Sequence, residues 1–360
     1  MYSYSNYVRA ASLDEAYELC QKKNNVVLGG ALWLRMQTRT FGTAIDLSDL
    51  GLDKIEENDE NFIIGAYVSL RDLERHVGFN AFTGGAAAEA VKHIVGVQFR
   101  NCATVGGSIF GRFGFSDVYT LFYALNARVR LYKAGEIGLD EFAGRPKNER
   151  DILTHIIVPK SACKQPAEIA AAERPYVEAA ERVEGDQAAD RFASRIVYLS
   201  QRNNSTDFPV LACAVSVLEN AEAGNGAEDT AISKSGGAAC LRAVIGATPY
   251  LAQCVDDTEG IVDTAQLLTG DLSDEEMLAQ ASAFAEYVAE HIRFDSNMRA
   301  GAAYRKHVCQ VLVRRAVQSL RKCEAAHSSA PKIDLNSSAE VKSKISPDAI
   351  FDLSSAEEVK

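Results

Sequence analysis

The amino-acid sequence predicts an α+β protein with two domains. The chain has 360 residues, which is enough for two separate hydrophobic cores. Strand-like and helix-like apolar patterns alternate from Val26 to Pro159, and they resume after a polar stretch with two strands and two long amphipathic helices. Hydrophobic residues make up 47% of the chain and charged residues 24%, the ordinary balance of a folded globular protein.

The first part of the chain mixes short strands with helices. Ser69 precedes one of these helices and is expected to cap it, because a serine side chain accepts a hydrogen bond from the free N–H groups of a first helical turn. A glycine-rich segment occupies residues 102–114. The expected strands are residues 26–30, 43–47, 62–68, 128–133 and 152–159, and the expected helices are residues 31–39, 69–77, 86–95 and 116–125.

A polar stretch separates this part from the next. Residues 161–191 are rich in Ala and Glu with few large apolar side chains, which is typical of a solvated insertion or linker. Beyond it, residues 192–325 form the second predicted domain, with strands at 208–218 and 241–247 and helices at 274–292 and 303–320.

The remaining residues, 326–360, are Ser-rich and polar. In this tail the segment DLNSSAEVK, from Asp334, recurs imperfectly as DLSSAEEVK, from Asp352. We expect a disordered extension, and paired docking peptides for a partner are the alternative.

Charge and composition exclude several classes of protein. With 38 basic and 49 acidic residues the formal charge is −11, so binding to nucleic acid is disfavoured, whereas a compact phosphate ligand held by backbone N–H groups is not. No apolar run reaches the roughly 18 residues that a membrane span needs. The N-terminus lacks the pattern of a secretion signal, so we expect a cytoplasmic protein whose eight cysteines are free thiols.

Several catalytic signatures are absent from the sequence. It contains no phosphate-binding Gly-Lys loop and no Gly-x-Gly-x-x-Gly, which disfavours ATPases of the Walker type and Rossmann dehydrogenases. It also contains no His-Glu-x-x-His, no Gly-x-Ser-x-Gly and no Cys-x-x-Cys. We therefore predict no metal or iron–sulfur site in this chain.

Two glycine pairs, Gly29-Gly30 and Gly106-Gly107, are the strongest candidates for ligand binding. Each pair follows aliphatic or β-branched residues that are typical of a strand end. Glycine adopts positive φ angles and approaches a ligand closely, so that successive N–H groups can converge on a diphosphate. Both loops would then hold one dinucleotide, and the alternative is that each pair is an ordinary turn.

The order of longer segments adds a family resemblance. VVLGGALWLR, TAIDLSDLGLDKIE, FIIGAYVSLRDLE and FRNCATVGGSIFGRFGFSDVYTLFYALNARVRL follow one another, and LRAVIGATPYLAQC and SNMRAGAAYRKHVCQVLVRRAV follow later. This series resembles the FAD-binding (medium) subunits of molybdenum hydroxylases, the family of the xanthine dehydrogenase and carbon monoxide dehydrogenase flavoproteins. The resemblance extends to Arg321, apart from the insertion.

The resemblance implies a fold and a cofactor, FAD. Residues 1–160 would form a two-lobed FAD-binding domain of the vanillyl-alcohol-oxidase type, with lobes at 1–56 and 57–160. Residues 192–325 would form a CO dehydrogenase flavoprotein C-terminal-like domain, an antiparallel sheet packed on helices.

The same resemblance implies the cofactor-binding residues. Two segments would hold the FAD diphosphate, Asp117 would lie near the ribityl hydroxyls, Ile94 near the adenine and Leu153 near the flavin. Asp117 also fits a plain role in the first turn of a helix. The first segment is Leu28, Gly29, Gly30, Ala31, Leu32, Trp33 and Leu34, and the second is Thr104, Val105, Gly106, Gly107 and Ser108.

The chain departs from the family pattern at four positions. Ala31 and Leu32 replace a Thr or Ser and a polar residue, Ser108 stands where Asn is frequent, and Gly114 stands where proline is common. Because these changes leave the backbone N–H donors in place, we expect FAD to be retained with altered affinity.

The resemblance implies an oxidoreductase function in a cytoplasmic hetero-oligomer. The chain would take electrons from a partner [2Fe-2S] subunit, reduced in turn by a molybdopterin-binding catalytic subunit, and pass them to NAD or another acceptor. Among the family, xanthine dehydrogenase subunits look most similar. The alternatives are a self-sufficient FAD-dependent oxidase of the same fold and a flavin-free assembly scaffold.

Overall fold

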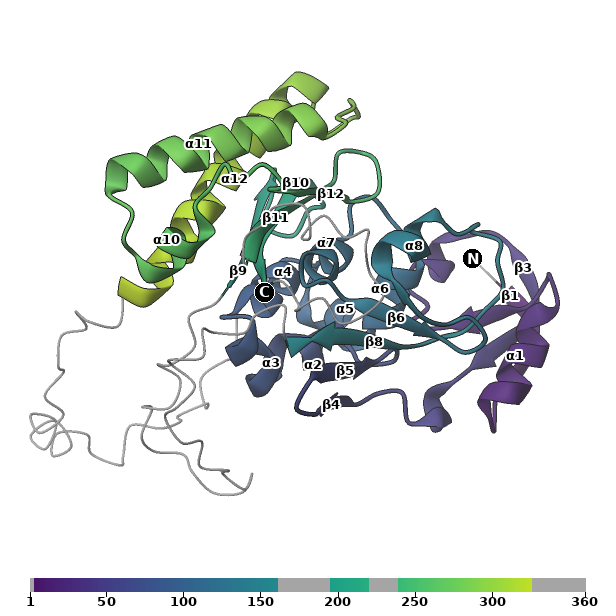
Figure 1. Ribbon diagram of the computed structural model, residues 1–360. Coiled ribbons are helices and arrows are strands. Elements are labelled where there is room, and N and C mark those ends of the chain that lie inside the picture. Colours follow the sequence, from purple (N-terminus) through teal and green to yellow (C-terminus); the bar gives the residue numbers. More distant parts are fainter. Residues whose placement is uncertain (1–2, 161–194, 220–238, 326–360) are drawn as a thin grey trace, which may run out of the picture.

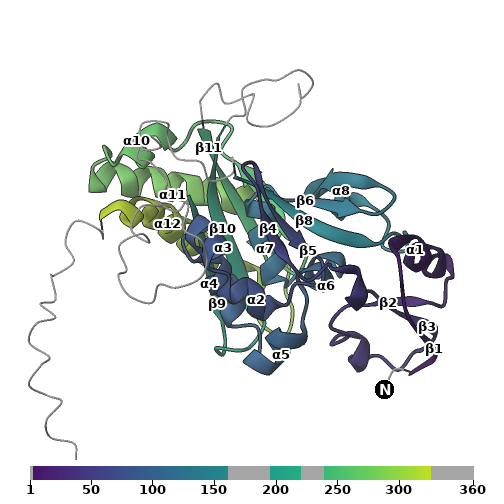
Figure 2. The ribbon, with the colours of Figure 1, turned by 90° about the horizontal axis from the view of Figure 1, so that it is seen from below.

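The structure of the protein is a computed structural model that describes residues 3–160, 195–219 and 239–325. Three sheets carry the architecture, and helices pack against each of them. The N-terminal sheet and helix α1 (Leu13–Gln21) lie at one end of the molecule, and the long helices α11 (Asp274–His291) and α12 (Ala302–Ala325) lie at the other (Figures 1 and 2). The Ala/Glu-rich insertion and the duplicated tail lie outside the described residues.

The N-terminal sheet is small and parallel. It contains β1 (Ser3–Arg9), β2 (Val26–Leu28) and β3 (Thr40–Asp46) in the order β1-β3-β2. Helix α1 packs against β3, and a compact core that includes Ala16, Ile45 and Leu47 lies between them. Since β2 and β3 run parallel, both end at the same edge of the sheet, and Leu28 lies opposite Asp46 there.

The second sheet is antiparallel and larger. Its strands follow the order β4-β5-β8-β6-β7, and their bounds are β4 (Ile55–Glu57), β5 (Asn61–Gly65), β6 (Arg128–Leu131), β7 (Gly135–Gly138) and β8 (Leu153–Pro159). The helices between and after these strands are α2 (Leu70–Arg75), α3 (Val77–Phe82), α4 (Ala86–Lys92), α5 (Val97–Cys102), α6 (Val105–Phe110), α7 (Asp117–Ala124) and α8 (Leu139–Gly144).

The third sheet belongs to the C-terminal part and is buried on both faces. Its strands are β9 (Ile196–Arg202), β10 (Pro209–Glu219), β11 (Ala239–Gly246) and β12 (Gln253–Asp256), and the remaining helix is α10 (Thr264–Thr269). One face of β10, with Ala212 and Ala214, joins the core around α4 and α7, and the opposite face, with Leu211 and Cys213, joins the core under α11 and α12. Because successive side chains of a strand point to opposite faces, β10 packs against both cores and joins the two parts of the chain.

Ser216 shows how a polar residue fits into this apolar strand. Its hydroxyl is fully buried and donates to the backbone carbonyl of Ala124, at the end of α7, at 2.6 Å.

Within residues 3–160, 195–219 and 239–325, no helix combines the length and apolarity that crossing a bilayer requires. Among the described residues, free thiols are found at Cys20, Cys102, Cys213, Cys240, Cys254 and Cys309.

Most predicted elements are present, and one prediction is wrong. Residues 31–39 do not form a helix: Ala31 has a left-handed φ of 56°, and only a single 3-10 turn, η1 (Leu34–Met36), follows. The predicted cap is confirmed, since the Ser69 side chain accepts from the Asp72 N–H. No local pattern indicated the strands β1, β4, β7, β9 and β12, the helices α1, α3, α5, α6, α8 and α10, or the turn η2 (Ser48–Leu50).

Arg305 anchors the loop before α12. Its side chain is fully buried, with Nε donating to the Val210 carbonyl at 3.0 Å and Nη1 to the carbonyls of Asp295 and Ala300 at 2.7 and 2.6 Å. Nη2 donates to Asn297 Oδ1 at 2.6 Å. One side chain thus fixes residues 295–300 against the start of β10.

We expect Arg305→Met to lower the free energy of unfolding by about 1–3 kcal/mol, because it removes the donor to the buried Val210 carbonyl and releases the loop at residues 295–300. Chemical denaturation of the full chain measures this change. The exposed neighbour Lys306 gives a matched control, and Lys306→Met should stay within about 0.5 kcal/mol of wild type. Equal effects of the two variants would contradict the anchoring role.

Candidate functional site

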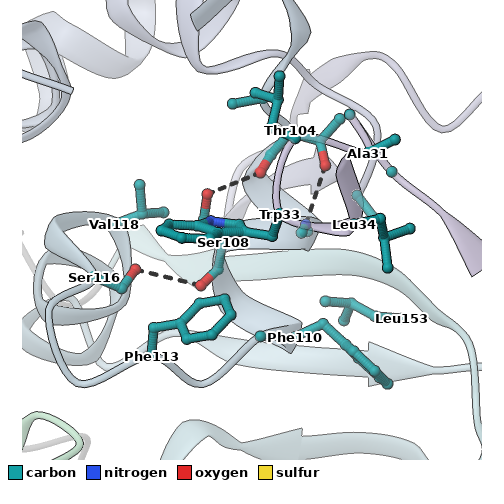
Figure 3. Close-up of a pocket in the computed structure, with 18 of the residues that line it drawn as sticks. Ala31, Trp33, Leu34, Thr104, Ser108, Phe110, Phe113, Ser116, Val118 and Leu153 are labelled. Atoms are coloured by element: carbon teal, nitrogen blue, oxygen red, sulfur yellow. Dashed lines mark hydrogen bonds between the residues drawn. The ribbon is translucent and has the colours of Figure 1, made fainter. Parts of the chain in front are cut away.

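A pocket of about 680 Å³ is lined by residues that follow strands of all three sheets. That volume falls within the range of small-molecule and cofactor sites, about 300–1,000 Å³. Its walls come from the loop after β2, from the start of α6, from residues 147–153 and from the turn between β9 and β10. Figure 3 shows Ala31, Trp33 and Leu34 of the first loop together with Phe110, Phe113 and Leu153 around the pocket.

The loop after β2 presents a row of unused donors. Among the described residues, none accepts a hydrogen bond from the backbone N–H groups of residues 29–33. The loop is held from its carbonyl side, because the Ala31 carbonyl accepts from Arg35 N–H at 3.0 Å and the Trp33 carbonyl from Met36 N–H at 3.3 Å. Five consecutive N–H groups beside a pocket form a site suited to an anion.

The segments that contain Gly29-Gly30 and Gly106-Gly107 are in contact with each other. A Cβ built on Gly30 would lie 1.9 Å from the Cys102 carbonyl oxygen, and one on Gly29 would lie 4.0 Å from Gly107 Cα. None of these four glycines has a positive φ. They are required for close approach of two backbone segments and not for left-handed geometry, which Ala31 adopts instead.

The second glycine pair does not form a loop like the first. Gly106 and Gly107 lie in the first turn of α6, where Thr104 Oγ1 accepts from Gly107 N–H at 3.1 Å and caps the helix. The Gly106 N–H donates to the Ala66 carbonyl at 2.9 Å, and the Ser108 N–H to the Thr104 carbonyl at 3.1 Å. These donors are already bonded within the chain, so the two pairs do not share one local design.

The segment still contributes side chains to the pocket. Thr104 and Ser108 line it, and the Ser108 hydroxyl donates to the Thr104 carbonyl at 3.0 Å (Figure 3). Val105 does not line it, because its side chain is fully buried in the core behind α6. Ile94 and Leu153 both line the pocket.

Four aromatic rings form one wall of the pocket. Trp33 lies 5.1 Å from Phe113, 5.5 Å from Phe115 and 5.9 Å from Phe208 between ring centroids, and the Arg299 guanidinium lies 4.9 Å from the Phe208 centroid. Gly114 separates Phe113 and Phe115, and a Cβ on it would lie 2.4 Å from the Tyr250 carbonyl oxygen. This contact explains the glycine at the position where the family favours proline.

Asp117 lies in the pocket wall, and its carboxylate is hydrogen bonded to residues of the C-terminal part of the chain. Asp117 Oδ1 accepts from the Tyr198 hydroxyl and from Arg202 Nη2, both at 2.5 Å and both from β9. Burial raises the pKa of the Asp117 carboxyl, and Arg202 and Tyr198 act in the opposite direction. Ser116, and not Asp117, caps α7 by accepting from Tyr119 N–H.

Several residues that line the pocket have no signature in the sequence. Arg150 fixes the approach to β2 by donating to the carbonyls of Cys20 and Lys22 at 2.7 and 2.8 Å, yet the sequence carries no signal for this contact. Other missed lining residues are Tyr67, His93, Phe113, Phe115, Lys147, Arg202 and Phe208. In the described ranges, no three His, Cys, Asp or Glu side chains cluster as metal ligands would.

Comparisons with known proteins agree with this architecture. Residues 2–161 match the model of the FAD binding domain in molybdopterin dehydrogenase, and residues 256–320 match that of the CO dehydrogenase flavoprotein C-terminal domain. No curated protein matches the sequence significantly.

Solved structures show the same fold at low identity. Quinoline 2-oxidoreductase from Pseudomonas putida 86 aligns with a TM-score of 0.64 and 14% identity, over 90% of this chain and 98% of the other. Carbon monoxide dehydrogenase from Hydrogenophaga pseudoflava, in a form lacking the Mo-pyranopterin moiety, gives 0.61 and 19%, over 88% and 97%. Reconstituted CO dehydrogenase from Oligotropha carboxidovorans gives 0.60 and 19%, over 89% and 97%.

Fold, pocket and family models together define a flavoprotein whose cofactor is FAD. The chain belongs to the family of FAD-binding subunits of molybdenum-containing oxidoreductases. The pocket fits the cofactor, because a diphosphate needs a row of backbone donors and residues 29–33 supply one without breaking existing hydrogen bonds.

We expect Gly30→Ala to destabilise the fold by about 1–3 kcal/mol, because the new methyl group overlaps the Cys102 carbonyl and must push the two segments apart. Thermal unfolding without added flavin measures this effect. Gly144→Ala is the matched control, since a Cβ at Gly144 meets nothing within 4 Å. A Gly30→Ala protein as stable as the control would show that the segments are not in contact.

Proposed function

We propose that this chain is the electron-transfer subunit of a molybdenum-containing hydroxylase of the xanthine dehydrogenase family. It takes electrons from a partner [2Fe-2S] subunit, which a molybdopterin-binding subunit reduces, and passes them to NAD or another acceptor in the cytoplasm. Bound FAD supplies the chemistry, since it accepts electrons singly and releases them in pairs. The row of free N–H groups beside the aromatic wall is the observation that carries the proposal.

In this proposal, different residues of the pocket contact different parts of FAD. Residues 28–34 hold the diphosphate, with N–H donors that each contribute about 1.5–3 kcal/mol to a charged acceptor. Residues 104–108 close the pocket from the opposite side and contribute the Thr104 and Ser108 hydroxyls. Ile94 contacts the adenine and Leu153 the flavin, while Asp117 orients Arg202 at the wall next to the ribityl chain.

Partner subunits are proposed from family membership. Family models match both parts of the chain, and the solved structures with this fold include a Cu,Mo carbon monoxide dehydrogenase. The domain division at residues 160 and 192 is also proposed on this basis, with the third sheet and its helices as the second unit.

FAD binding is directly measurable because Trp33 is the only tryptophan of the chain and lies in the pocket wall. We expect FAD added to apoprotein to quench tryptophan fluorescence, with flavin that acid precipitation releases. Gly30→Ala should weaken binding at least tenfold, a change of about 1.4 kcal/mol, while Gly144→Ala leaves it unchanged. Covalently retained flavin would favour the oxidase alternative, and the absence of quenching would favour the scaffold.

The partner subunits and the electron acceptor are tested on the complex purified with this chain. A tag on this chain should co-purify a molybdopterin-binding subunit and a [2Fe-2S] subunit, identified by mass spectrometry and metal analysis. With NAD as acceptor, anaerobic NADH should bleach the flavin band of the holoprotein, because the transfer is reversible. A tagged chain that remains alone would contradict the subunit role, and an unbleached flavin would exclude NAD.

A further inference from the structure

Tyr67 lies between the two glycine segments, and no motif in the sequence indicates a role for it. It lies in the turn between β5 and α2 and lines the pocket. Its ring packs against the core of the N-terminal lobe, which includes Ile45 and Leu47. Its backbone N–H donates to the Leu52 carbonyl at 2.8 Å, so both backbone and ring are fixed.

The Tyr67 hydroxyl bridges the ends of two parallel strands. It donates to the Leu28 carbonyl, where β2 ends, and accepts from Leu47 N–H, just after β3, at 3.1 Å. A neutral phenol performs both roles at once. Burial raises the pKa of Tyr67 to about 12, so the hydroxyl keeps its proton throughout the physiological range.

The bond to Leu28 determines the orientation of the loop that follows. In a trans peptide unit the carbonyl and the N–H point in opposite directions. Because Tyr67 holds the Leu28 carbonyl on its own side, the Gly29 N–H of the same peptide unit is directed the other way. Gly29 carries the first of the five free N–H groups, so this peptide sets the start of the row.

The residue before Tyr67 fixes the other segment. The Ala66 carbonyl accepts from Gly106 N–H at 2.9 Å, and a Cβ on Gly106 would lie 2.6 Å from that same oxygen. One dipeptide, Ala66-Tyr67, therefore holds the first loop through a hydroxyl and the second segment through a carbonyl.

We propose that Tyr67 is a positioning residue for the cofactor, whose hydroxyl orients the Leu28–Gly29 peptide so that the loop receives the FAD diphosphate. The proposal rests on the proposed function. It assigns Tyr67 an effect on ligands that carry a diphosphate, in addition to its packing in the lobe.

The test compares Tyr67→Phe with Tyr132→Phe. Both substitutions remove one hydroxyl from a ring packed on the same core, but the Tyr132 hydroxyl donates to Asp14 and Tyr132 does not line the pocket. The Kd for FAD and for riboflavin, which has no phosphate, is measured on full-length apoprotein below the melting temperature of each variant. Melting temperatures without ligand are recorded alongside.

We expect the Kd for FAD to rise about tenfold in Tyr67→Phe and less than twofold in Tyr132→Phe, with the Kd for riboflavin unchanged in both. A lower melting temperature with unchanged FAD affinity, or equal weakening of FAD and riboflavin, would overturn the positioning role. If the wild-type chain binds no FAD, the proposed function itself fails, and this outcome is distinct from the other two.

A second measurement needs no variant and applies if Tyr67→Phe does not fold. In a crystal structure of the FAD-bound wild-type chain, Tyr67 Oη should remain hydrogen bonded to the Leu28 carbonyl while the diphosphate contacts N–H groups of residues 29–33. A Tyr67 side chain turned away from Leu28, or a diphosphate bound elsewhere, would overturn the proposal.

Discussion

The pocket depends on two close backbone contacts, each made possible by a glycine. Gly30 lies against the Cys102 carbonyl, and Gly106 lies against Ala66, at separations that exclude a Cβ. The absence of a side chain at Gly30 lets the loop after β2 meet the segment between α5 and α6. The free N–H groups of residues 29–33 lie beside this contact, so the geometry of the contact sets the geometry of the site.

The two glycine-containing segments, residues 28–34 and 104–108, differ in their hydrogen bonding. In the first, the carbonyls of Ala31 and Trp33 accept hydrogen bonds within the turn, and no described residue accepts from the N–H groups of residues 29–33. In the second, a Thr104 cap and the Ala66 carbonyl take up the N–H groups and make the segment rigid. One segment is therefore arranged for binding and the other for support, although both contain a Gly-Gly pair.

The sequence predicted what depends on local pattern. The strands at Asn61–Gly65 and Leu153–Pro159 and the Ser69 cap follow from alternation and capping chemistry, and the glycine pairs indicated two segments that line the pocket. The helix expected at 31–39 was wrong because apolar spacing in a short segment does not distinguish a helix from a loop that turns its side chains inward. The partners of Asp117 lie 81 and 85 residues further along the chain, and local pattern carries no information about such pairs.

The C-terminal sheet has a consequence for how the protein can be divided. One face of β10 belongs to the core around α7, and the turn after β9 carries Phe208 into the aromatic wall. Removing residues beyond 194 would expose the apolar surface of α4 and α7 to water and open one side of the pocket. The N-terminal portion is therefore a poor candidate for isolated expression, and gene fusions or splits in this family member are best placed outside the segment from β9 to α12.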